Sequence, residues 1–440
     1  MTEAASGTGS ERHDAPEDTL AVGVYDRSVV AMLVSIFTSS VAAMAAETAL
    51  GKQVYDLTHS DLDLGLLGLA EFAPAALLVL LSGSLADRYD RRLICGLSLG
   101  VMTGMGAVLA WYAGQQAGDV LPIFGFVVLF GAARAVMNPA QRALVPDLVP
   151  PETLPWLIVR RTVTWQVAII SGPVLAGFLY AVDPAAPYIA MAALLGVGAL
   201  ALLFVKPLPR TRAYVAPRAG LHEAFEGLRF IRRSPVLLGA ISLDLFAVLF
   251  GGAVALLPAL AEDQLHVGAV GLGWLRAAGG IGATAVTLYL TRRPVVRHVG
   301  RSLLVAVAVF GLGTIVLGAT SSFVIAFVAL MVLSGADSIS VFIRSSLVPL
   351  VTPADKRGRV LAVEAVFIGA SNELGGFESG VAGEFLGSSV AVVLGGAATL
   401  VVAGTYFAFF APLRDIDRFP ASVDMDDEML EPTTPPVAPP

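Results

Sequence analysis

Residues 83–92 read GSLADRYDRR, and this short basic turn stands between two apolar runs, 64–85 and 93–114. Each run has roughly the 20 residues that an α-helix needs to cross a hydrocarbon core of about 30 Å. Arginines close to the end of such a run resist translocation and stay on the cytoplasmic side. The stretch therefore predicts a helical hairpin through a membrane, with its turn in the cytoplasm.

Apolar runs of this length recur along the whole chain. The composition agrees, because 56% of the residues are hydrophobic and only 14% are charged, whereas soluble domains carry about 25% charged residues. Twelve membrane spans are expected at 28–50, 64–85, 93–114, 120–144, 155–181, 185–205, 236–261, 270–290, 302–319, 323–347, 360–386 and 390–412. The sequence thus predicts an all-α membrane protein with twelve transmembrane helices.

The basic residues gather in every second loop. Of the 28 Lys and Arg residues, only Lys52 falls in a loop that is expected on the far side of the membrane. The basic loops are 88–92, 142–161, 206–233, 292–301 and 356–359. This asymmetry predicts a multi-pass protein of the bacterial inner (plasma) membrane with both termini in the cytoplasm.

Composition divides the chain into five segments. The first and last are polar and acidic or proline-rich, too poor in apolar residues to build a core, and are expected to be disordered cytoplasmic tails. The connection between the halves has apolar residues at helical spacing, which predicts an amphipathic helix on the inner leaflet. The expected boundaries are 1–27 for the N-terminal tail, 28–206 for the first six helices, 207–235 for the cytoplasmic linker, 236–412 for the second six helices and 413–440 for the C-terminal tail.

The two halves repeat each other. Residues 131–150 read GAARAVMNPAQRALVPDLVP and residues 335–353 read GADSISVFIRSSLVPLVTP, with Leu144 matching Leu347. Chance similarity between small-residue apolar helices is the alternative, but further segments match in nearly the same register. The sequence therefore predicts two pseudo-symmetric six-helix bundles, a feature of transporters.

The turn at 83–92 resembles the loop motif G-x-L-A-D-R-x-G-R-R of the major facilitator superfamily, with Asp90 in place of the usual glycine. Stretches 138–150, 242–280 and 357–380 resemble the enterobactin-exporter-like branch of that superfamily. The resemblance implies a latch that joins the two bundles on the cytoplasmic side, and Glu364 could join it. The latch residues are Gly83, Asp87, Arg88, Arg91, Arg92 and Glu364. A plain basic stop-transfer loop is the other interpretation.

Charged residues inside the spans are the strongest functional candidates, because a charge at the bilayer centre costs about 2.5–3.5 kcal/mol. Arg134, Asp244 and Asp337 lie at similar depths in spans four, seven and ten. In the superfamily these spans line the central cavity, which implies that the three residues lie near the substrate route. The hypothesis is that Asp244 or Asp337 takes up a proton while Arg134 serves as its ion-pair partner. A static pair that merely locks helices is the alternative.

Further charges are expected along the substrate and proton route nearer the far side. Glu71 and Arg276 occupy matched positions in the two halves and could form an outer gate. Glu373, Glu378 and Glu47 are candidate neighbours in the same region. Isolated carboxylates that face water, or lie at the interface, explain them equally well.

Motifs for other chemistry are missing from the sequence. It contains neither H-E-x-x-H nor G-x-x-x-x-G-K-[ST], and its five histidines lack metal-ligand spacing. The expectation is a monomeric secondary transporter, not an enzyme, with no metal, cofactor or nucleic acid. The resemblance to the exporter branch implies membrane lipids, protons and an amphipathic small molecule as its partners. The small molecule would be a drug-like compound, siderophore or metabolite that is exported by alternating access. Uptake or facilitated diffusion, and a non-coupled receptor or lipid-handling protein, are the alternatives.

Overall fold

The computed structural model of the chain describes residues 26–115, 118–206 and 221–420, except for the side chains of 79–81, 84, 87 and 221–224. The described residues form helices joined by short turns. In the first half the elements are α2 (Arg27–Thr58), α3 (Asp61–Arg88), α4 (Arg91–Gly114), α5 (Leu121–Leu144), η1 (Val145–Leu148), α6 (Leu154–Val182) and α7 (Ala186–Leu202). In the second half they are α8 (Leu221–Arg233), α9 (Pro235–Phe250), α10 (Leu257–Ala259), η2 (Leu260–Gln264), α11 (Gly268–Arg292), α12 (Val299–Ala319), α13 (Phe323–Leu350), α14 (Ala354–Leu386), α15 (Ser388–Phe409) and α16 (Ala411–Arg414).

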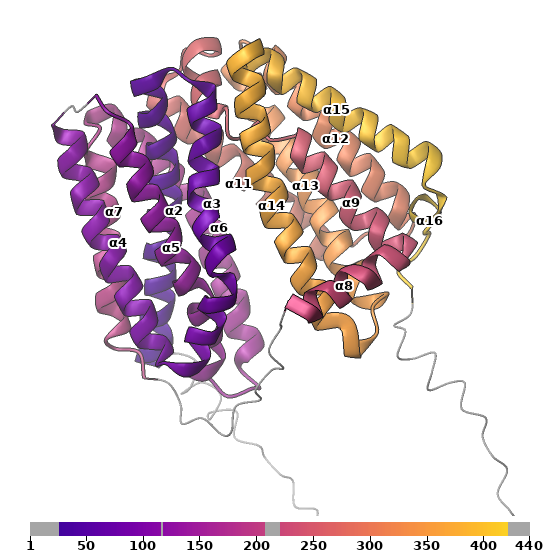
Figure 1. Cartoon of the computed structure of the whole chain (residues 1–440), viewed down its shortest axis with the longest axis horizontal. Helices are drawn as coiled ribbons and strands as arrows, with labels where there is room; N and C mark the ends of the chain where they lie inside the picture. Colours follow the sequence, from indigo (N-terminus) through magenta and orange to yellow (C-terminus); the bar gives the residue numbers. More distant parts are fainter. Residues whose placement is uncertain (1–25, 116–117, 207–220, 421–440) are drawn as a thin grey trace, which may run out of the picture.

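The helices form two bundles that stand side by side (Figure 1). Helices α2 to α7 make the N-terminal bundle, and α9 to α15 make the C-terminal bundle. Within the described residues, eight helices are long and apolar enough to cross a membrane, and the bent pair α8 and α9 adds a ninth. Helices α3, α7 and α11 complete the bundles, although α7 has only 17 residues and α3 and α11 carry charges. The predicted all-α membrane protein with twelve helices in two bundles is confirmed.

The seventh span is broken, whereas the sequence predicted a continuous helix over 236–261. Helix α9 ends at Phe250, and helical structure resumes with α10 and the π-turn η2. At the break Gly252 packs so closely on α14 that a Cβ would lie 2.7 Å from the Oγ of Ser379. The apolar pattern hides this break because both sides of it remain hydrophobic.

The first helix is longer than expected. Helix α2 continues to Thr58, so Lys52 lies within a helix and not in a loop as predicted. Lys52 is buried, and its Nζ donates a hydrogen bond of 2.9 Å to Glu262 of the other bundle. The prediction failed because the last turns of α2 are polar and resemble a loop in composition, yet Lys52 finds acidic partners on its own helix and in the other bundle.

Helix α8 of the connection lies across the end of the C-terminal bundle and meets α9 at 106°. Its Ile231 is buried among residues of α9, α13 and α14, so the second half of its apolar face packs on protein, whereas Phe225 is exposed. Residues 207–220 of the expected linker and the expected tail 1–27, apart from Asp26 and Arg27, lie outside the described part of the chain.

The expected C-terminal tail begins with an ordered segment. Leu413 is buried, and the backbone N–H of Gly300 donates a hydrogen bond of 2.9 Å to the carbonyl of Ile416. Residues 413–420 therefore pack on the start of α12, and residues 421–440 lie outside the described part.

The molecule has two chemically different ends. The basic end carries the turn at 88–92, the loop at 292–301 and the start of α14 at 354–359. The opposite end carries the turns at 59–60 and 387, and the π-turn η2. In Figure 1 the two bundles meet toward the top and diverge toward the end that carries α8, which is the basic end.

Candidate functional site

An ion pair lies deep in the C-terminal bundle. The guanidinium of Arg344 on α13 approaches the Oδ1 of Asp244 on α9 to 2.8 Å, and the two side chains are only 5% and 7% exposed. Removing two charges from water is expensive, and only close pairing offsets that penalty. The pair therefore holds α9 against α13.

Two further carboxylates share the same guanidinium. Arg344 interacts electrostatically with Asp337 on α13 and with Glu364 on α14 as well as with Asp244. We call Asp244, Asp337, Arg344 and Glu364 the buried cluster. It contains three acids and one base, so its charge depends on how many of the acids carry a proton.

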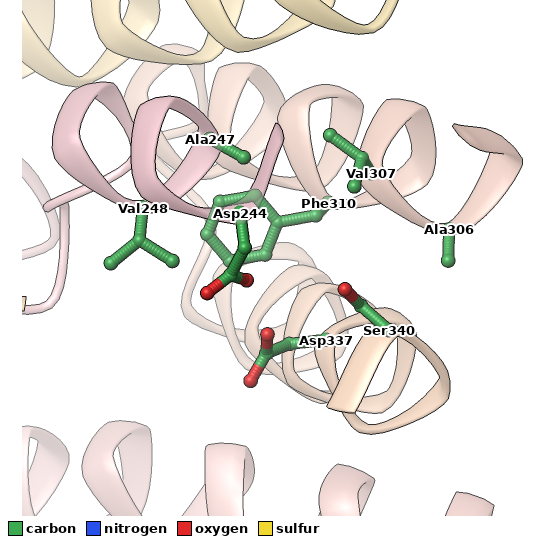
Figure 2. A pocket seen from close by; sticks show the side chains of 8 residues that line it. All are labelled: Asp244, Ala247, Val248, Ala306, Val307, Phe310, Asp337 and Ser340. Atoms are coloured by element: carbon green, nitrogen blue, oxygen red, sulfur yellow. The ribbon is translucent and has the colours of Figure 1, made fainter. Parts of the chain in front are cut away.

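A small cavity opens between two of these acids. Figure 2 shows Asp244 and Asp337 facing the same space, with Ser340 and Phe310 beside them. Its volume is about 10 Å³, which is close to the least space that one water molecule needs. A water at this place would connect the two carboxylates by hydrogen bonds, and so give a proton a path between them.

The pairing differs from the one that the sequence suggested. Arg134 does not join Asp244 or Asp337; it forms an ion pair with Glu71, which lies on α3 of its own bundle. Sequence reasoning missed Arg344, the actual partner of Asp244. A signal was present, because Arg344 follows Asp337 by two helical turns and therefore lies on the same face of α13.

A second group of charges lies where the bundles meet. Arg276 on α11 donates a hydrogen bond of 2.9 Å to Glu47 on α2, which joins the two bundles. Glu71 interacts electrostatically with Arg134, Glu47 and Arg276, and Glu373 on α14 interacts with Glu71, Glu47 and Arg134. We call Glu47, Glu71, Arg134, Arg276 and Glu373 the cross-bundle cluster.

The cross-bundle cluster brings together most of the residues expected on the far half of the route. Glu373 comes close to Glu71 because Gly68 leaves room for it: a Cβ at Gly68 would lie 2.6 Å from the Oε2 of Glu373. Glu378 is exposed on α14, and no described contact links it to the cluster. Glu71 and Arg276 interact, but each has another residue as its direct ion-pair partner.

Contacts between the bundles continue from this cluster to the opposite end. Ser60 donates to Glu384 at 2.9 Å, Ser388 donates to Asp61 at 2.7 Å, and Tyr55 donates to Asp263. These bonds connect the ends of α2 and α3 with η2, α14 and α15. The opposite end of the molecule is thus closed by polar contacts.

Two glycine seams support the same closure. On one seam a Cβ at Gly380 of α14 would lie 2.8 Å from the Cα of Gly65 of α3. On the other, a Cβ at Gly177 of α6 would lie 3.1 Å from the Cα of Gly273 of α11. The second seam extends about halfway along both helices, where Gln166 of α6 donates a hydrogen bond of 3.0 Å to Thr284 of α11. The backbones therefore touch in the half of the molecule away from the basic end.

The expected latch residues make contacts within the N-terminal bundle. Arg91 donates to the carbonyl of Ala143 and to Asp147, both at 2.9 Å, and Arg92 donates to the carbonyl of Val205 at 3.0 Å. Arg88 is exposed, and the side chain of Asp87 lies outside the described part of the structure.

Two further residues of the expected latch have different surroundings. A Cβ at Gly83 would meet no atom within 4 Å, so no helix packs closely against this glycine in the described structure. Glu364 is buried and belongs to the buried cluster, not to the turn at 83–92. The bundles diverge at the basic end, and this separation leaves the turn with partners from its own bundle (Figure 1).

Within the described residues, no three His, Cys, Asp or Glu side chains form a group that could hold a metal ion. The chemistry that the two clusters offer is ionic pairing and proton exchange between carboxylates.

The chain is similar to known membrane transporters. The profile of the family described as "Transmembrane secretion effector" matches residues 24–435. The enterobactin exporter EntS of Citrobacter koseri is 26% identical over 342 residues, which are 75% of this chain and 79% of that protein. The uncharacterized MFS-type transporter YfiS of Bacillus subtilis is 24% identical over 362 residues, covering 79% of this chain and 84% of that protein.

Solved structures share the fold. A bacterial homolog of the human lysosomal transporter Spinster, in an inward-facing and occupied conformation, superimposes with a TM-score of 0.70 at 14% identity, covering 89% of this chain and 98% of that chain. The nucleoside transporter NupG gives a TM-score of 0.64 at 17% identity, covering 87% and 98%. The resemblance seen in the sequence is confirmed: this multi-pass membrane protein belongs to the transmembrane secretion effector family of the major facilitator superfamily of transporters.

Proposed function

We propose that the chain is a proton-coupled exporter of an amphipathic small molecule, which works by alternating access with its basic end in the cytoplasm. The observation that carries the proposal is the buried cluster, in which Asp244 and Arg344 pair at 2.8 Å while Asp337 and Glu364 compete for the same guanidinium.

Proton uptake would change the pairing inside the buried cluster. A proton that binds a carboxylate oxygen of Asp244 removes its negative charge, and the ion pair with Arg344 is lost. Arg344 then has Asp337 and Glu364 as its remaining partners. Because Asp244 lies on α9 and Arg344 on α13, a change of partner alters the force that holds these two helices together.

The contacts at the opposite end fit one state of an alternating-access cycle. Opening that end requires that Arg276 leave Glu47, that Lys52 leave Glu262, and that both glycine seams separate. The basic end would then close, and the turn at 83–92 could act there as the expected latch. A substrate site between the bundles would face one side of the membrane at a time.

The class of solute is suggested by a relative. The enterobactin exporter EntS, at 26% identity, favours export of a siderophore or another amphipathic organic molecule. The cross-bundle cluster offers both signs of charge, with Glu47, Glu71 and Glu373 beside Arg134 and Arg276. Such a site can bind polar groups of either charge, while apolar helix surfaces accept the remainder of an amphipathic molecule.

The proposal is tested in everted membrane vesicles with an imposed pH gradient. Enterobactin and the lipophilic cation ethidium serve as trial solutes, and uptake into the vesicles reports export. Asp244→Asn or Asp337→Asn should remove the gradient-dependent uptake, whereas the exposed Asp417→Asn should retain it. Full gradient-dependent uptake in both buried variants would exclude proton coupling through this cluster. Uptake that proceeds equally without a gradient would identify a facilitated carrier instead.

A further inference from the structure

A groove outside the candidate site opens on the side of the C-terminal bundle. It has a volume of about 690 Å³ and lies between α11, α12 and α13. This volume falls within the roughly 300–1,000 Å³ of known ligand pockets. Apolar side chains such as Val286, Val305, Val309, Val332 and Ile339 form most of its wall.

Small residues explain why the groove is hollow. Helices α11 and α13 come together at Gly335, where a Cβ would lie 2.8 Å from a methyl group of Val286. Helix α12 approaches α13 closely at Gly313, where a Cβ would lie 2.9 Å from the Cβ of Leu333. From there to the basic end, short valine and alanine side chains leave the space between the three helices unfilled.

An arginine lies at the mouth of the groove. Arg301 and Ser302, in the first turn of α12, line it at the basic end together with Val295. The neighbouring segments 291–301 and 411–420, all described, contain more basic than acidic residues: Arg292, Arg293, Arg297, Arg301, Arg414 and Arg418, but only Asp415 and Asp417.

Arg301 is available to a ligand. It is exposed and makes no hydrogen bond or ion pair with any described residue. The acid that interacts with it electrostatically, Asp415, already accepts hydrogen bonds of 2.8 and 3.2 Å from Arg414. The hydrogen bond from Arg414 lowers the pKa of Asp415, so this acid remains ionised and bound to its neighbour.

We propose that this lateral groove binds an anionic phospholipid, with an acyl chain between α11, α12 and α13 and the phosphate at Arg301. A guanidinium suits a phosphate, because its donors match the geometry of two phosphate oxygens. The apolar wall can contact an acyl chain, because it lies at the depth of the bilayer where acyl chains are found. Each basic residue at the membrane surface contributes about 1 kcal/mol to the free energy of binding anionic lipid headgroups.

The groove lies next to the buried cluster, so a bound lipid would reach the helices that carry it. Ala306 lines both the lateral groove and the water-sized cavity between Asp244 and Asp337. Ala336, which also lines the groove, directly precedes Asp337. A bound chain would therefore contact α12 and α13 directly behind the buried cluster. Lipid binding itself does not depend on the proposed transport function.

The experiment uses the full-length protein in detergent with phosphatidylglycerol that carries a photoreactive acyl chain. After illumination, mass spectrometry of the digested protein locates the labelled residues. Labelling is expected on the groove-facing residues of α11, α12 and α13. Excess unlabelled phosphatidylglycerol should compete, whereas phosphatidylethanolamine and soluble glycerol phosphate should not.

Two pairs of matched variants sharpen the test. Arg301→Gln should weaken phosphatidylglycerol binding about fivefold, while Arg297→Gln, an exposed arginine outside the groove, should change it less. Val305→Trp should fill the groove and abolish labelling, while Val316→Trp, three turns further along α12, should not. The proposal is overturned if phosphatidylethanolamine competes equally and Arg301→Gln has no effect. That result would mean that bilayer lipids cover the groove without regard to their headgroup. It is equally overturned if labelling survives Val305→Trp, or if glycerol phosphate alone competes.

Discussion

The surroundings of Arg344 restrict its substitution. Its side chain is 5% exposed, and it approaches Asp244 while Asp337 and Glu364 lie near enough to interact. A single guanidinium therefore neutralises part of the charge of three acids. Without it, the acids would have to bind protons or leave the bundle interior.

Replacement of Arg344 by methionine should lower the free energy of unfolding by about 3–5 kcal/mol, because Asp244 is left buried and unpaired. The double variant with Asp244→Asn should lose clearly less than the sum of the two single changes, since the isolated charge is gone. The measurement is SDS-induced unfolding in mixed micelles, with exposed Arg297→Gln as the control. Additive losses would show that the two residues do not stabilise each other.

At the scale of elements, the seam between α3 and α14 depends on glycine. Gly380 packs so closely that a Cβ would lie 2.7 Å from the carbonyl oxygen of Asp61 and 2.8 Å from the Cα of Gly65. Both are backbone atoms, which cannot move without the helix. A larger side chain at Gly380 must therefore separate the two helices at the opposite end of the molecule.

Gly380→Leu should thus favour a conformation with the opposite end open. In this background Ala382→Cys, a half-buried position on the same helix, should react several-fold faster with a membrane-impermeant maleimide. The native Cys95 is buried and gives little background. Gly404→Leu is the matched control, because a Cβ there meets no atom within 4 Å. An unchanged rate in Gly380→Leu would mean that this seam does not hold the opposite end closed.

Across the whole molecule, closure at the opposite end and divergence at the basic end define one asymmetric state (Figure 1). Ion pairs such as Glu47 with Arg276 connect bundles that the chain itself links through residues 207–220. The same bonds would have to break and reform in each transport cycle. Partly exposed ion pairs suit that role, because water can replace the lost partner.

The orientation of the molecule is a prediction at this scale. Tyr89→Cys, at an exposed position of the basic end, should react with an impermeant maleimide only from the cytoplasmic side. Pro184→Cys, in the exposed turn after α6, should react only from the outside. Intact cells and everted vesicles provide the two sides. Outside labelling of Tyr89→Cys would reverse the topology and with it the proposed direction of transport.

The sequence by itself determined the number of spans, the two-bundle fold and the family. Hydropathy and span length depend only on local composition, and the motif at 83–92 is contiguous, so none of these needs knowledge of packing. The local pattern failed at Lys52 and at the break after Phe250. The acidic partner of Lys52 comes from the other bundle, and the close glycine contact at the break comes from α14.

Only the tertiary structure decided which charges meet. The sequence gives the depth of Arg134, Asp244 and Asp337 along their helices, but not the rotation of each helix or its neighbours. Packing α5 on α3 directs Arg134 to Glu71, and packing α13 beside α9 directs Arg344 to Asp244. An ion pair needs contact within a few ångströms, and in a bundle of near-parallel helices that contact depends on lateral arrangement, which no single span encodes.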